Sequence, residues 1–131
     1  MARCRCHSGK QEKRCCGPLH DGKAAPTAEA LMRSRYAAYA RGLVDYIIAT
    51  TAPGPQVQED PEAWRLSIAQ FCRQTRFEGL RIVEHVDGEQ EAFVTFEATL
   101  TQAGWDASFS ERSRFVRVEG RWAYHSGVGR R

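Results

Sequence analysis

The fold is decided by the stretch Leu80-Arg81-Ile82-Val83-Glu84-His85-Val86-Asp87-Gly88 together with Ala92-Phe93-Val94-Thr95-Phe96-Glu97-Ala98-Thr99-Leu100. In the second segment apolar side chains occupy every other position from Ala92 to Leu100, which is the period of a strand with one buried face. Asp87-Gly88 lies between the two segments and is a turn signal. The two segments therefore predict a β-hairpin.

Two further strands are expected after this hairpin. Ala103-Gly104 turns the chain into a strand over 108–118, and Glu119-Gly120 turns it into a strand over 121–126. Together with the hairpin they predict a four-stranded antiparallel meander.

Upstream of the hairpin the apolar period lengthens to that of a helix. We expect one helix over roughly 27–41, a short one over 46–50 with Asp45 as its cap, and a third that begins at Asp60-Pro61. Helices followed by strands predict an α+β domain over residues 26–128. In this domain three helices pack on a curved four-stranded antiparallel sheet.

The composition is that of a folded protein without a membrane span. Of the 131 residues 42% are hydrophobic and 27% are charged, which is too apolar for a disordered chain. No apolar run approaches the roughly 20 residues that a membrane helix needs. Because the first residues lack the apolar segment of a secretory signal, we expect a cytoplasmic protein with reduced cysteines.

Four of the five cysteines lie within the first sixteen residues, in the pattern C-x-C-x8-C-C. Clusters of four cysteines in reducing compartments are typically closed zinc sites, in which no position is left for a substrate. The first two cysteines point to one side of an extended segment, and the adjacent pair can reach the same metal from a turn or a helix start. The sequence therefore predicts a zinc knuckle over residues 1–22 that holds structural Zn²⁺ through Cys4, Cys6, Cys15 and Cys16.

Three other interpretations of the cluster stay open at this point. The thiols could be incidental, they could be oxidised in an exported chain, or His7 or His20 could replace one of the cysteines as a ligand. The fifth cysteine, Cys72, falls on the apolar side of the third expected helix, and we interpret it as a buried core thiol.

The knuckle is also basic. Residues 1–16 carry a local charge of +4, from Arg3, Arg5, Lys10, Lys13 and Arg14 against Glu12. Such a patch stabilises the thiolates of a zinc site, and it also attracts phosphates.

The segment Cys4-Arg5-Cys6-His7-Ser8-Gly9-Lys10, followed by Cys15-Cys16-Gly17, resembles the SEC-C motif. This zinc knuckle is found at the C-terminus of the SecA translocation ATPase and in many other proteins. In the SecA family the module is a docking surface for a partner chaperone, and the resemblance implies a role of that class here.

Over essentially its whole length the chain resembles the YchJ-like family of small bacterial proteins. These proteins join a SEC-C knuckle to a cone-shaped domain of the nuclear-transport-factor and cystatin-like type. The resemblance lies in Pro26 to Tyr36, Gln74-Thr75-Arg76-Phe77, Glu111-Arg112-Ser113-Arg114-Phe115 and Gly120-Arg121-Trp122. The chain has Ser110 where members of the family usually carry a His. The resemblance implies a cystatin-like cone with a biochemical function that is unsettled.

The resemblance to cone folds of this type implies a pocket between the helices and the concave face of the sheet. In the third long strand Glu111 and Ser113 share one parity with two phenylalanines, so all four side chains face the same side. Arg35 borders the apolar face of the first helix and is the natural counter-ion of Glu111. Three roles of this pair stay open at this point: a structural ion pair, a ligand-binding pair and a catalytic pair.

Aromatic side chains are the other candidates for the pocket wall. They are Tyr36, Tyr46, Trp64, Trp122 and Tyr124. With the polar residues, the expected pocket set is Arg35, Tyr36, Glu111, Ser113 and Trp122.

Three functions are consistent with these features. The leading hypothesis is a protein-interaction module that uses the zinc knuckle as its docking surface. The first alternative is a small-molecule-binding or enzymatic pocket in the cone, although no P-loop, G-x-S-x-G, H-E-x-x-H or dinucleotide motif occurs and no catalytic residue is assigned. The second alternative is nucleic-acid or ribosome association through the basic residues of the knuckle.

Overall fold

The computed structural model describes residues 2–54 and 60–130, and the side chains of all of these except 129 and 130. Its elements are η1 (Glu12–Arg14), α1 (Gly17–His20), α2 (Ala28–Arg41), α3 (Val44–Ala49), α5 (Pro61–Gln74), β1 (Thr75–Val86), β2 (Glu91–Gln102), β3 (Trp105–Asp106), β4 (Phe109–Val118) and β5 (Arg121–Arg130).

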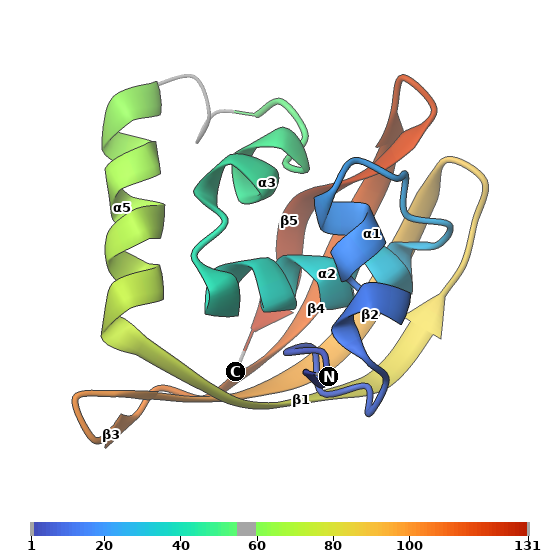
Figure 1. Cartoon of the computed structure of the whole chain (residues 1–131). Helices are drawn as coiled ribbons and strands as arrows, with labels where there is room; N and C mark the ends of the chain where they lie inside the picture. Colours follow the sequence, from blue (N-terminus) through green and yellow to red (C-terminus); the bar gives the residue numbers. More distant parts are fainter. Residues whose placement is uncertain (1, 55–59, 131) are drawn as a thin grey trace.

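The long strands form an antiparallel sheet in the order β1-β2-β4-β5, and β3 pairs with β2. The sheet curves around the helices, with α2 lying across its concave face (Figure 1). This arrangement confirms the predicted α+β class and the four-stranded meander. The two-residue strand β3 and the one-turn helix α1 are additions that the sequence pattern did not predict.

Local signals begin and end α2. The hydroxyl of Thr27 accepts a hydrogen bond from the backbone N–H of Ala30 at 3.0 Å, which satisfies one of the free donors of the first turn. Gly42 ends the helix in the left-handed conformation, with φ of 73°. The predicted first helix is therefore confirmed within one residue at its start.

Three faces of α2 contact three different parts of the molecule. Leu31, Met32 and Tyr36 belong to the main core against the sheet. Ala37 packs on the cysteines, and Ala38 packs in a cluster with residues of α3 and α5. Helix α2 is therefore the element that joins the knuckle, the other helices and the sheet.

The other helices depart from the sequence prediction in one detail. Asp60 caps α5 as expected, because its carboxylate accepts from the N–H of Ala63 at 3.1 Å. Asp45, however, does not cap α3. The cap residue is Leu43, and Asp45 lies in the first turn, where its carboxylate contacts Arg65 at 2.6 Å.

Helix α5 passes directly into β1, without a loop between Gln74 and Thr75. The strand therefore starts earlier than the expected start near Gly79, because Thr75, Arg76 and Phe77 already pair with the end of β2. The direct junction fixes α5 beside the concave face of the sheet.

Candidate metal centre and pocket

The four cysteines of the knuckle converge on one point. All their sulfur atoms lie within 4.8 Å of one another, with 3.5 Å between Cys6 and Cys15 and 3.9 Å between Cys15 and Cys16. Four sulfurs bound tetrahedrally with metal–sulfur bonds of about 2.3 Å are about 3.8 Å apart. The cluster therefore fits a tetrahedral metal ion with four thiolate ligands.

Short turns bring the two halves of this cluster together. The N–H of Cys4 donates to the carbonyl of Lys10 at 2.8 Å, which turns the chain back after the first two cysteines. Gly17 is required where the loop meets α1, because a Cβ there would lie 2.8 Å from the carbonyl oxygen of Glu12. Cys16 is the cap residue of α1. Gly17 and Pro18 therefore begin a helix directly after the last cysteine of the cluster.

Hydrogen bonds among the thiols shift the pKa values of two of the cysteines in opposite directions. The Cys16 thiol donates to Cys6, and this bond lowers the pKa of Cys6 despite its burial, with a further contribution from Ser8. The same bond, together with burial, raises the pKa of Cys16. A divalent ion needs all four sulfurs as thiolates, so binding of the metal releases the remaining protons.

Neither histidine of the knuckle belongs to the cluster. His7 Nε2 lies 3.4 Å from the carbonyl oxygen of Phe77 in β1. His20 has both ring nitrogens in contact with α2, at 2.8 Å from the carbonyl of Ser34 and 2.8 Å from Nη1 of Arg41. The two imidazoles hold the knuckle against the domain and do not replace a cysteine.

The knuckle packs directly on α2. Cys4, Cys6 and Cys16 form a small cluster with Ala37, whose side chain is fully buried. Arg33 of α2 also donates to the carbonyl of Cys6 at 3.3 Å. The metal site therefore has one face against the domain and one face toward solvent.

Cys72 takes no part in the metal site. It is half-buried and packs beside Ile47 and Ile68 between α3 and α5. Burial raises the pKa of its thiol, which favours the protonated form.

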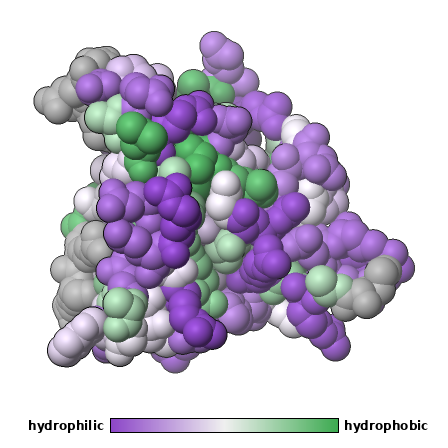
Figure 2. Space-filling view, turned by 60° about the vertical axis from the view of Figure 1, so that its left-hand side comes forward, coloured by the Kyte–Doolittle hydropathy of each residue, from purple (hydrophilic) through white to green (hydrophobic). Residues whose placement is uncertain are grey.

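A pocket of about 410 Å³ lies between α2, α5 and the concave face of the sheet. On the side of the molecule that carries α5, hydrophobic side chains line a hollow between hydrophilic ones (Figure 2). The pocket is lined by Met32, Arg35, Tyr36, Tyr39, Trp64, Ser67, Ile68, Phe71, Phe77, Phe96, Ala98, Leu100, Phe109, Glu111, Ser113, Phe115 and Tyr124.

Trp122 and Tyr46, two of the residues expected in the pocket, lie outside it. In the register of β4 and β5 Tyr124 pairs with Phe115, whereas Trp122 pairs with Arg117, two positions closer to the turn. Trp122 is buried in the core under the guanidinium of Arg117, 4.3 Å from its ring. The wall position on β5 therefore belongs to Tyr124, and Tyr46 makes a hydrogen bond with Ser34 instead.

Arg35 and Glu111 both line the pocket, but they do not form the direct ion pair expected from the sequence. Arg35 Nη1 donates to the carbonyl of Ile47 at 3.0 Å and to the hydroxyls of Thr50 at 2.7 Å and Thr51 at 3.1 Å. Residues at the end of α3 and directly after it therefore accept the hydrogen bonds of Arg35, in place of the carboxylate of Glu111. Sequence reasoning missed this contact because neither threonine stands out in the pattern.

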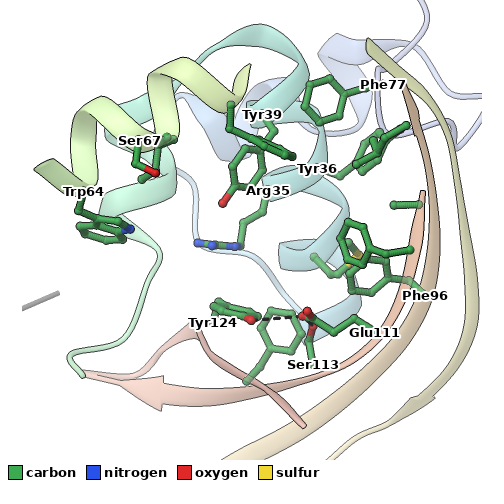
Figure 3. Close-up of a pocket in the computed structure, with 17 residues that line it drawn as sticks. Arg35, Tyr36, Tyr39, Trp64, Ser67, Phe77, Phe96, Glu111, Ser113 and Tyr124 are labelled. Carbon is green, nitrogen blue, oxygen red and sulfur yellow. Dashed lines mark hydrogen bonds between the residues drawn. The ribbon is translucent and has the colours of Figure 1, made fainter. Parts of the chain in front are cut away.

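Tyr124 links the two charged residues. Its hydroxyl donates to Glu111 at 3.2 Å, and the guanidinium of Arg35 lies over its ring, 4.8 Å from the centroid (Figure 3). Ser113 donates a second hydrogen bond to the same carboxylate. Burial, followed by the charge of Glu111, raises the pKa of Tyr124, so its hydroxyl stays protonated as a donor.

We expect Arg35→Met and Glu111→Gln to have unequal effects on stability. Glu111→Gln keeps an acceptor for Ser113 and Tyr124 and should cost about 1 kcal/mol in the free energy of unfolding. Arg35→Met removes the donor of three hydrogen bonds, one to a buried carbonyl and two to half-buried hydroxyls, and should cost about 2–3 kcal/mol. Urea unfolding of both variants measures the difference. Equal losses of about 3–5 kcal/mol would indicate a direct buried pair instead.

No helix within residues 2–54 and 60–130 is long and apolar enough to cross a membrane.

Comparisons with known proteins agree with both parts of the chain. A SEC-C motif containing protein from Rhodopseudomonas palustris, known from a solution structure, is 36% identical and superposes with a TM-score of 0.80 over 96% of this chain and 97% of the other. A SEC-C motif containing protein from Psychrobacter arcticus, known from a crystal structure, is 28% identical with a TM-score of 0.75, over 91% of this chain and 72% of the other. The profile of the YchJ middle NTF2-like domain matches residues 27–127. The chain therefore belongs to the YchJ family, and residues 27–127 form the family's middle NTF2-like domain.

Proposed function

We propose that this protein is a cytoplasmic adaptor in which Zn²⁺ shapes the knuckle into a docking surface for an acidic segment of another protein. The donor set supports zinc, because four thiolates in tetrahedral arrangement are the typical ligands of structural zinc. Four protein ligands complete the coordination of such an ion, so its role is to hold the knuckle in shape.

The single observation that carries the docking proposal is a basic groove of about 640 Å³ where the knuckle meets the start of α2. The cations of its wall are Lys10, Arg14, Lys23 and Arg33, and its one acidic residue is Glu29. Arg33 pairs with Glu29 at 3.2 Å. Among the described residues the other three cations form no ion pair.

The groove suits an acidic peptide better than a single-stranded nucleic acid. Its wall combines the cations with apolar side chains, those of Pro18, Leu19, Pro26 and Ala30. The first 35 residues contain no Phe, Trp or Tyr, and proteins that bind single strands usually stack bases on such rings. Apolar contacts beside charges are typical of a protein interface.

The experiment compares the proteins that two double variants capture from a cell extract. Both variants replace two cations by two glutamates, so the change in net charge is the same. Lys10→Glu/Lys23→Glu reverses two cations of the groove, and Arg73→Glu/Arg76→Glu reverses two exposed cations at the junction of α5 and β1. Immobilised full-length proteins are incubated with cell extract, with and without nuclease treatment, and bound proteins are quantified by mass spectrometry. We expect the groove variant to lose at least 90% of a specific bound protein that the control variant retains.

Two controls make the result decisive. The metal content of both variants is measured first, so that a loss of capture is not a loss of the knuckle. Capture that disappears after nuclease treatment would favour nucleic-acid binding and contradict the adaptor proposal.

A further inference from the structure

The pocket has one polar end and one apolar end. Arg35, Glu111, Ser113 and Tyr124 are grouped at one end, whereas Phe77 lies at the other (Figure 3). Phe96 is the cross-strand neighbour of Glu111. Most of the remaining wall is aromatic or aliphatic. Its volume of about 410 Å³ is within the range of roughly 300–1,000 Å³ that is usual for small-molecule sites.

The two charged side chains at the polar end, those of Glu111 and Arg35, differ in the groups that contact their charge. The carboxylate of Glu111 accepts hydrogen bonds from two hydroxyl groups, those of Ser113 and Tyr124. Arg35 is only 8% exposed, and among the described residues no carboxylate lies within ion-pair distance of it. Its hydrogen-bond partners on α3 are all neutral. The buried charge with no carboxylate in direct contact is therefore that of Arg35, on which Glu111 acts only from a longer distance.

A buried cation without a counter-ion is costly in a folded protein, and a bound anion removes that cost. The three hydrogen bonds to the end of α3 and the residues after it all start at Nη1, and the hydroxyl of Tyr39 also accepts from this guanidinium. At least two of the five N–H groups of Arg35 therefore remain for a further acceptor. Two N–H groups of one guanidinium can bind a carboxylate in bidentate geometry.

We propose that the pocket binds an amphipathic monocarboxylate, with its carboxylate at Arg35 and its apolar body among the aromatic side chains. This site is separate from the basic groove and does not depend on the adaptor function. Glu111 at the polar end opposes a head group that carries two negative charges. The apolar end opposes a second carboxylate, because a buried charge without a partner is costly. A phosphate monoester or a dicarboxylate of the same length therefore binds more weakly.

The test uses the full-length, metal-loaded protein and isothermal titration calorimetry with four probes. The probes are decanoate and 4-phenylbutanoate, and decanamide and 4-phenylbutanamide as their uncharged counterparts. We expect at least one carboxylate to bind with one site per chain and a Kd at least ten-fold lower than that of its amide. Decanedioate should bind at least ten-fold more weakly than decanoate.

Matched variants locate the site. Arg35→Met should remove the preference for the carboxylate, and Arg81→Met, at an exposed position of β1 outside the pocket, should keep it. Ser67→Trp places a large ring at the pocket wall from an exposed position of α5 and should weaken both probes, whereas Gln70→Trp on the same helix should not. The Ser67 variant keeps the test decisive if Arg35→Met does not fold.

Three outcomes would overturn the proposal. The first is that neither carboxylate binds the wild-type protein at millimolar concentration. The second is that carboxylate and amide bind equally well, and the third is that binding is unchanged in Ser67→Trp.

Discussion

Removal of the metal is expected to disorder residues 2–22 and to leave the sheet folded. Within this segment the buried side chains are Cys4, Cys6, Cys16 and Leu19, which is far too little apolar surface to fold so short a chain. Structural zinc contributes about 10–16 kcal/mol of apparent binding free energy in comparable small domains. We therefore expect the fold of the knuckle to depend on the ion.

The sheet is expected to survive because its core is built without the knuckle. The fully buried members of that core begin at Ala28 in α2 and continue through β2, β4 and β5. Loss of the knuckle uncovers Ala37 on the opposite side of α2. We expect the remaining domain, residues 26–128, to lose about 2 kcal/mol of stability from this exposed face and still unfold cooperatively.

Chelation followed by circular dichroism and amide NMR measures both effects. Protein purified without added zinc should contain one zinc ion per chain, and Cys15→Ser should abolish it, whereas the matched control Cys72→Ser should keep it. Loss of the β-sheet signal after chelation would show that knuckle and sheet fold as one unit. A metal content near zero in the untreated protein would contradict the zinc site itself.

The features that could be predicted from the sequence are those set by local repetition. Alternation from Ala92 to Leu100 required one buried face, and these five alternate positions are all buried. The cysteine pattern likewise named the four side chains that converge, because a tight site needs ligands from short turns. Both signals are contained in a few consecutive residues.

Features that depend on how separate elements meet could not be predicted. Thr50 and Thr51 become partners of Arg35 only because α3 lies beside the middle of α2. Trp122 and Tyr124 share one parity on β5, but Trp122 pairs with Arg117, two positions nearer the turn. Parity alone does not show how far along a strand the pocket extends. Helix α1 has only four residues and so shows no periodicity.

The second large effect is expected for Phe115→Ala, which should lower the free energy of unfolding by about 3–5 kcal/mol. Phe115 is 1% exposed, and its ring packs edge to face on Tyr124 at 5.8 Å between centroids. Phe93 is the matched control. It is half-buried on the other face of the sheet, under the guanidinium of Arg112 at 4.6 Å, so Phe93→Ala should cost only about 1 kcal/mol.

Urea unfolding of the two variants therefore tests the register of the sheet as well as the core. In the observed register Ala92 pairs with Phe115 and Phe93 pairs with Arg114, so the two phenylalanines lie on opposite faces. A slip of β2 by one residue against the core would bury Phe93 and expose the residues on either side of it, which are buried in the observed register. Equal losses in the two variants, or a larger loss for Phe93→Ala, would contradict this register. Because the pocket wall depends on the same pairing of β4 with its neighbours, they would also contradict the placement of Glu111, Ser113 and Tyr124 around Arg35.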